Sequence, residues 1–157
     1  MSSQFTCIHV YQTATTTSAT ATTVLALLAA ANQAVNVVGF KVSFNGATST
    51  NTPDLIEWGY ITFATNAIGT NSTSVTPQKQ DSARPETIQT TMGKAWTSEP
   101  TVWTVLDNMY LADFNGSFLF VVPYYAPIIV KGGIGFGIRL TTGGSTSSAT
   151  CSLTFTE

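Results

Sequence analysis

Two segments near the C-terminal end alternate strictly between apolar and non-apolar residues. Apolar side chains occupy every even position of residues 134–141 and every odd position of residues 149–156. This period of two is the signature of a β-strand with one face on a core and the other outside. Residues 142–148 consist of glycine, serine and threonine, a composition typical of loops. Together the two segments predict a terminal β-hairpin.

Further strands are expected upstream. Residues 38–44 alternate in the same way and end at Asn45-Gly46, a turn signal. Residues 54–64 and 117–122 are apolar on both parities, which indicates strands covered on both faces. In a small sandwich, the second cover could be a neighbouring subunit.

Two stretches fit helical and strand spacing about equally well. Residues 22–31 are rich in alanine and leucine, which favour helix. Residues 102–110 contain apolar positions at either period, with an Asp-Asn pair between them. Both are expected to be strands. Residues 66–99 form long polar connections, which in compact domains are usually functional or mobile.

The count of eight or nine strands, with no secure helix, predicts a fold class. We expect a single-domain, all-β antiparallel β-sandwich of jelly-roll or related topology. Residues 22–157 would form the sandwich. Residues 1–21, rich in threonine, would form an extended N-terminal arm or an extra strand.

The surface of this chain carries unusually little charge. Only 9% of its residues are charged, against roughly 25% in typical proteins. Serine and threonine together supply 42 of the 157 residues. A neutral, threonine-coated extracellular protein is one interpretation. The favoured one is that neighbours in an assembly cover much of the surface, because free monomers generally keep charge for solubility.

The same composition argues against several partners. The net charge is −2 and no basic stripe is present, so direct nucleic-acid binding is not expected. The longest apolar run, residues 24–31, is far too short to span a membrane as a helix. The N-terminal residues lack the pattern of a signal peptide. Synthesis in a cytoplasm is therefore expected.

Catalytic chemistry finds little support in the sequence. The one histidine, His9, lies inside an apparent strand, and a lone strand histidine is usually structural. Asp54 and Glu57 have opposite strand parity, so they would point to opposite faces. Residues 132–137 resemble a phosphate loop but precede a strand instead of a helix. Gly135 and Gly137 would instead let another backbone or a subunit approach closely. We expect no enzyme, no metal site and no cofactor.

Two cysteines, Cys7 and Cys151, lie near opposite ends of the chain. They could be two buried apolar residues. They could also form a bridge between the first strand and the last, although cytoplasmic synthesis favours reduced thiols.

The order of strands and turns resembles small β-sandwich proteins encoded among the head genes of tailed bacteriophages. The segments that carry the likeness are residues 37–46, 54–64, 76–79, 99–101 and 128–133. Members of that group act as capsid decoration or cement proteins, commonly as trimers on the shell. The resemblance implies a structural virion protein at the capsid surface, made in the host cytoplasm. Its partners would be the major capsid protein and itself, as a homotrimer.

Two other functions stay open: a single-jelly-roll shell protein, and a receptor- or glycan-binding knob of a tail fibre. Trp96 could cap the core or anchor a partner, since tryptophan is enriched at contact hot spots. A glycan-binding knob would use Trp96, Trp103 and Tyr124 for stacking. The full set of candidate interface residues is Phe5, Ile8, Tyr11, Trp96, Trp103, Tyr124 and Tyr125.

Overall fold

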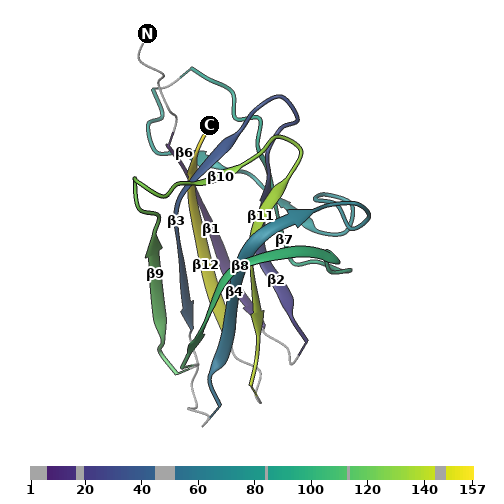
Figure 1. The fold of residues 1–157 in the computed structure, drawn as a ribbon, viewed down its shortest axis with the longest axis vertical. Helices are drawn as coiled ribbons and strands as arrows, with labels where there is room; N and C mark the ends of the chain where they lie inside the picture. Colours follow the sequence, from purple (N-terminus) through teal and green to yellow (C-terminus); the bar gives the residue numbers. More distant parts are fainter. Residues whose placement is uncertain (1–6, 17–19, 45–51, 84, 113, 144–147) are drawn as a thin grey trace.

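The fold is a sandwich of two antiparallel six-stranded sheets, seen in a computed structural model (Figure 1). The structure describes residues 7–16, 20–44, 52–83, 85–112, 114–143 and 148–157, with the backbone alone for residues 7–16. The described residues contain strands and turns but no helix. The expected all-β sandwich is therefore confirmed.

Each sheet combines long strands with short ones. Sheet A has the order β10-β3-β12-β1-β6, and β9 also pairs with β3. Sheet B has the order β5-β7-β2-β11-β4-β8. The strands of sheet A are β1 (Cys7–Thr16), β3 (Val35–Phe44), β6 (Gln78–Lys79), β9 (Ser117–Val121), β10 (Ile128–Val130) and β12 (Ser148–Thr156). Those of sheet B are β2 (Thr22–Leu28), β4 (Asp54–Thr62), β5 (Thr73–Val75), β7 (Thr91–Lys94), β8 (Val102–Leu111) and β11 (Gly135–Thr141).

The long strands pair in a nested order. β1 pairs with β12, β2 with β11, β3 with β9, and β4 with β8. The chain thus resembles one long folded hairpin. That hairpin rolls up because β12 also pairs with β3 and β11 also pairs with β4. This is the double-sheet jelly roll, an arrangement that leaves few strand edges open.

The expected terminal hairpin is wrong. β11 and β12 are strands, as the alternation predicted, but they belong to different sheets. Each is a central strand with a partner on both sides, drawn from the first half of the chain. The chain therefore passes from one sheet to the other between Thr141 and Ser148.

The two ambiguous stretches are strands. Residues 22–28 form β2 and residues 102–111 form β8, so burial and cross-strand pairing outweigh the helix propensity of alanine and leucine in β2, while residues 29–31 lie beyond its end. The long polar connection between residues 66 and 99 contains the short strands β5, β6 and β7, which were not predicted because they show no period-two alternation.

The N-terminal segment contributes to the sandwich. Residues 7–16 form β1, which lies between β12 and β6 in sheet A. The sandwich therefore starts at or before residue 7, and the boundary expected at residue 22 separates β1 from β2. Residues 1–6 and 17–19 lie outside the described residues.

An aromatic cluster occupies the core between the sheets. Phe40 of β3 is 2% exposed, and its ring centroid lies 5.1 Å from those of both Trp58 and Phe120. The rings of Phe118 and Phe136 lie 6.0 and 6.4 Å from that of Phe40. Such ring pairs add to the stabilisation that comes from burying apolar area. The cluster ties β3 and β9 of sheet A to β4 and β11 of sheet B.

A second apolar layer covers the outer face of sheet B. Gly135 and Gly137 are buried there, and a Cβ added to Gly135 would lie 2.4 Å from the Phe63 ring. A Cβ on Gly137 would meet Ile61 and Ala26 at 2.7 and 2.9 Å. The space beside these glycines is thus filled from within the chain, and a Cβ on Gly135 would also lie 2.7 Å from the Leu27 carbonyl oxygen, the close backbone approach that the glycines predicted. This layer also explains why β4 is apolar on both parities.

The register of β1 and β12 excludes a disulfide between the two cysteines. Cys7 lies opposite Thr156, whereas Cys151 lies opposite Gln12. Five ladder positions separate the two cysteines, or roughly 16 Å along the strands, and a disulfide needs Cα atoms within about 7 Å. Cys151 is a free, buried thiol, and burial raises its pKa to about 12.

We predict that Cys151 is inert in the native protein. In a Cys7→Ser variant, Cys151 is the one remaining thiol, and its raised pKa leaves almost no thiolate near pH 8. A thiol-reactive dye should therefore label the variant only after a denaturant is added. Rapid labelling of the native variant would contradict the burial.

We also predict that Phe40→Ala destabilises the fold severely. Removing a buried phenylalanine ring costs about 3–5 kcal/mol of unfolding free energy, because the sheets cannot close the cavity. Urea unfolding followed by tryptophan fluorescence measures the loss. Lys41→Ala, at the exposed neighbouring position, should change the free energy by less than about 0.5 kcal/mol.

Candidate interaction surface

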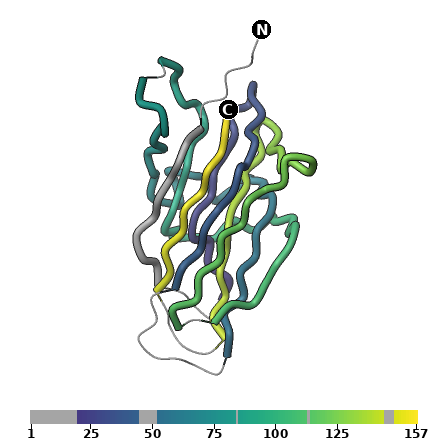
Figure 2. Tube along the Cα trace, turned by 90° about the vertical axis from the view of Figure 1, so that its left-hand side faces the viewer, coloured from purple at the N-terminus to yellow at the C-terminus, as the bar shows by residue number. Residues whose placement is uncertain are grey.

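The two sheets end on the same side in β8 and β9. β8 is the last strand of sheet B, and β9 pairs with β3 at the margin of sheet A. The ring centroid of Trp58 in β4 lies 5.8 and 5.4 Å from those of Phe118 and Phe120 in β9, so β4 lies over β9. β8 pairs with β4 and therefore lies on the same side of the sandwich as β9. Figure 1 shows β9 as the outermost strand of its sheet, and Figure 2 shows the molecule from the side on which β9 lies.

Exposed apolar side chains gather on this part of the chain. Among the described residues, every large hydrophobic residue at least 37% exposed lies on β8, β9, β10 or their connections, except Val38 on the neighbouring β3. We call this set the apolar edge. Its members are Val102, Val105, Leu106, Tyr110, Phe114, Leu119, Val121, Tyr124, Tyr125 and Ile129. Scattered exposed hydrophobics are ordinary, but their concentration on consecutive elements of the chain is typical of contact sites.

A rigid turn displays two tyrosines within the apolar edge. Residues 123–127 read Pro-Tyr-Tyr-Ala-Pro, and the Ala126 N–H donates to the Pro123 carbonyl oxygen at 3.0 Å. Tyr124 is 100% exposed and Tyr125 is 88% exposed. Because the prolines and the hydrogen bond fix the backbone, these rings lose little freedom on binding.

A shallow depression lies beside β9 on the outer face of sheet A. Its volume is about 270 Å³, and Val38, Leu119 and Val121 give it an apolar lining. Gly39 forms its floor, where a Cβ would lie 2.5 Å from the Phe120 carbonyl oxygen. The depression is too open to enclose a small molecule, but it makes the surface beside Leu119 and Val121 concave.

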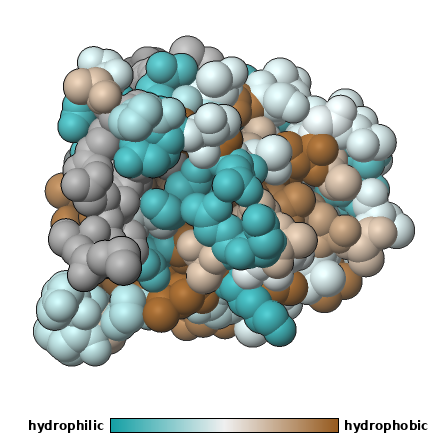
Figure 3. Space-filling view, turned by 90° about the horizontal axis from the view of Figure 1, so that it is seen from above, coloured by the Kyte–Doolittle hydropathy of each residue, from teal (hydrophilic) through white to brown (hydrophobic). Residues whose placement is uncertain are grey.

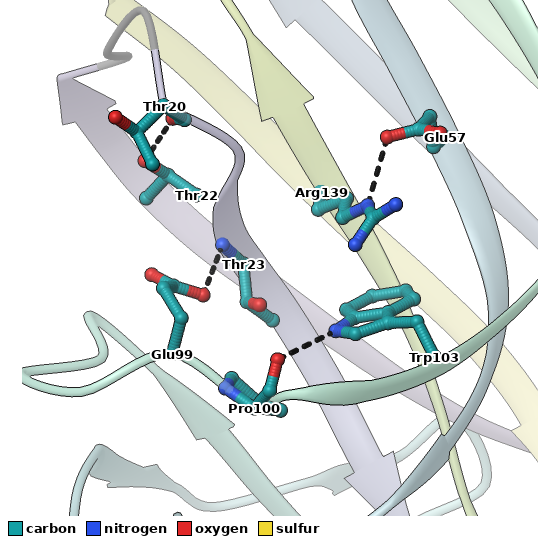
Figure 4. Close-up of polar contacts among 8 residues, drawn as sticks. All are labelled: Thr20, Thr22, Thr23, Glu57, Glu99, Pro100, Trp103 and Arg139. Atoms are coloured by element: carbon teal, nitrogen blue, oxygen red, sulfur yellow. Dashed lines mark hydrogen bonds and ion pairs between the residues drawn. The ribbon is translucent and has the colours of Figure 1, made fainter.

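The candidate tryptophans lie elsewhere, over the outer face of sheet B. The half-buried ring of Trp96 is nearly parallel to that of Phe63, with centroids 6.4 Å apart and planes 8° apart. The Trp103 ring faces the Arg139 guanidinium at 4.8 Å, and its Nε1–H donates to the Pro100 carbonyl oxygen at 3.2 Å (Figure 4). Both rings therefore already have partners within the chain.

Charged groups on this face are also engaged within the chain. Arg139 Nε lies 2.8 Å from Glu57 Oε2, and both side chains are largely buried (Figure 4). Nearby, Glu99 Oε2 accepts a hydrogen bond of 2.8 Å from the Thr23 N–H. Burial raises the pKa of Glu99, and the hydrogen bond from the Thr23 N–H and the charge of Arg139 oppose that rise. These contacts join β4 to β11 and tie the connection that carries Glu99 to β2.

Within the described ranges, no group of three His, Cys, Asp or Glu residues is placed to hold an ion. Asp54 is buried and accepts a hydrogen bond from the Gly143 N–H at 3.2 Å, while Glu57 lies on the opposite face of β4 with Arg139. In the described part of the chain, no helix has the length and apolar character needed to cross a membrane.

The predicted interface residues divide into three groups. Tyr124 and Tyr125 belong to the apolar edge, whereas Trp96 and Trp103 pack on sheet B. The three residues proposed for glycan stacking are thus not brought together. Phe5 lies outside the described residues, and for Ile8 and Tyr11, which stand in β1, only the backbone is described.

Sequence reasoning missed most of the apolar edge. Residues 117–122 are apolar on both parities, a pattern that also fits a strand buried on both faces. No local signal distinguishes these two situations, because the sheet topology alone decides which strand lies at the margin.

Comparison with known proteins adds no relative. No protein-family model matches the chain, and neither the curated proteins nor the solved structures contain a match.

We predict that Glu99→Gln changes how stability depends on pH. The raised pKa of Glu99 means that the folded state binds a proton more readily than the unfolded state, whose carboxyl has the ordinary value of 4.5. As pH rises above 4.5, the wild-type protein should therefore lose stability relative to the glutamine variant. The variant keeps an oxygen acceptor for the Thr23 N–H.

Thermal unfolding of both proteins between pH 3 and pH 7 measures the difference. Below about pH 4 the carboxyl is mostly protonated in both states, so the difference should be constant there, which serves as an internal control. A wild-type protein that gains stability over the variant as pH rises would contradict the direction of the pKa shift.

Proposed function

We propose that this chain is a structural virion protein, a capsid decoration or cement protein that binds the outer shell as an oligomer and stabilises the head. The observation that carries the proposal is the apolar edge, which leaves the consecutive edge strands β8 and β9, one in each sheet, with exposed hydrophobic side chains. A shell partner, the major capsid protein, would cover the β8 part of that surface.

The low charge supports the same function. Polar contacts made by serine and threonine need less desolvation than contacts made by lysine and glutamate. The outward side chains of β12 are serine and threonine throughout, all half-buried. Seen from the end that carries the C-terminus, apolar residues also reach the surface between hydrophilic ones (Figure 3). Such a surface suits permanent contact with protein neighbours.

β8 offers the longest surface for a shell contact. It is ten residues long and contributes four side chains of the apolar edge, with Asp107 as its one charged residue. A bulge at Leu106, between Val105 and Asp107, interrupts its ladder with β4. Bulges discourage strand addition, so we expect side-chain packing across β8 rather than an added strand.

A second candidate is a single-jelly-roll shell protein. The nested pairing of β1–β4 with β12–β8 favours it, because viral capsid proteins use this topology. Lectin domains use it as well, and fold alone does not decide function. A shell protein would assemble by itself into large particles, whereas a decoration protein would remain a small oligomer.

The test uses shells of the virus whose genome encodes the chain, prepared without this protein. We expect the purified chain to bind them saturably and to raise the temperature at which they rupture. A Leu106→Ala, Tyr110→Ala double variant should bind about tenfold or more weakly, because it removes exposed apolar contacts on β8.

The matched control is a Thr73→Ala, Ser74→Ala variant. These two residues are exposed on β5, at the opposite margin of sheet B, and their replacement should leave binding unchanged. Shells that neither bind nor gain stability from the wild-type chain would overturn the proposal, and large particles formed by the chain alone would favour the shell protein.

A further inference from the structure

The outer edge of β9 presents unpaired backbone groups. The Gly116 carbonyl oxygen accepts from Phe44 N–H at 2.8 Å, and Val122 N–H donates to the Val38 carbonyl oxygen at 2.9 Å. Both ends of β9 thus direct even-numbered residues towards β3. Because backbone groups alternate along a strand, those of Ser117, Leu119 and Val121 point away from β3. No described strand pairs with that side of β9.

β9 also lacks the features that normally protect an edge strand. Its five residues include no charged side chain and no proline, and its register with β3 runs without a bulge. Edge strands in soluble proteins usually carry at least one of these. β8, at the margin of the other sheet, has both a bulge and Asp107. The contrast indicates that β9 is built to be paired.

The sequence of β9 complements itself in antiparallel orientation. With a two-fold axis at Leu119, this residue would face Leu119 of a second copy, Phe118 would face Phe120, and Ser117 would face Val121. Aromatic residues then meet aromatic residues, and no like charges oppose each other. This register also sets the outward-pointing backbone groups of both strands opposite each other, as hydrogen-bonded pairs require. We infer that a second copy of this chain occupies the edge of β9, and that two sheets A join into one continuous sheet.

The elements flanking β9 extend the contact. In the same register, the tyrosine turn of one copy lies beside Phe114 of the other. Phe114 is 47% exposed, while Leu119 and Val121 are 67% and 64% exposed. The two tyrosines alone present on the order of 400 Å². With β9 and Phe114, each copy approaches the ~800 Å² that a stable complex usually buries per partner.

This contact does not depend on the proposed function. It uses β9 and the tyrosine turn, whereas the proposed shell contact uses β8, so either can fail without the other. It predicts a two-fold dimer in solution, in the absence of any shell. A trimer, which the phage resemblance implies, would need a different contact.

The test is the mass of the purified chain, by light scattering after gel filtration. We expect twice the chain mass of 16.6 kDa. Leu119→Lys and Leu119→Glu should each weaken self-association by roughly tenfold or more, because like charges would meet on the axis. Both substitutions place a charge at a well-exposed position, so the folded monomer should tolerate them.

Mixing the two variants provides the decisive measurement. Lysine on one copy would face glutamate on the other, so the mixture should recover the dimer that neither variant forms alone. The control pair, Leu106→Lys and Leu106→Glu on β8, should remain dimeric separately and mixed. The inference is overturned by a monomeric wild-type chain, by a trimer whose mass the Leu119 variants do not change, or by a mixture that stays monomeric.

Discussion

The packing of Phe40 against Trp58 and Phe120 determines where the edge strands β8 and β9 lie. These three rings come from β3, β4 and β9, and so from both sheets. Once Phe120 is held between the sheets, the side chains on either side of it in β9 must point outwards, because strand residues alternate. The exposure of Leu119 and Val121 is thus a consequence of core packing, and the same rings that stabilise the fold orient the surface that we assign to contact.

Strands were predictable from the sequence, but their partners were not. The alternation in residues 134–141 and 149–156 identifies β11 and β12 because burial on one face imposes a period of two. Nothing in those residues says that β12 pairs with β3, whose Ser43 carbonyl oxygen accepts from the Thr150 hydroxyl across 107 positions of sequence. A local pattern favours the nearest partner, which explains the incorrect hairpin. The short strands β5–β7 escaped notice because hydrogen bonds to neighbouring strands, and not apolar alternation, define them.

Only two residues of the apolar edge, Tyr124 and Tyr125, were predicted from the sequence. Tyr124 and Tyr125 stand between two prolines, which favour a turn at the surface, and both are exposed. Trp96 stands in a polar stretch and Trp103 stands among threonine and apolar residues, yet Phe63 and Arg139 contact their rings. The two tryptophans are covered because residues from other parts of the chain, among them Phe63 and Arg139, pack with them on the outer face of sheet B. Sequence shows that an aromatic residue needs a partner, and only the tertiary arrangement shows whether the chain supplies one.

The passage from β8 to β9 has a mechanical consequence. The chain leaves the margin of sheet B and enters the margin of sheet A within the five residues 112–116. A force that pulls β9 outwards is therefore shared with β8 through this short link and with β4 through the rings between the layers. Peeling one ladder bond by bond would be the weakest response of a sheet to tension. Displacing β9 would break the ring contacts with Trp58 of β4 as well as the ladder with β3, so the two layers resist the force together.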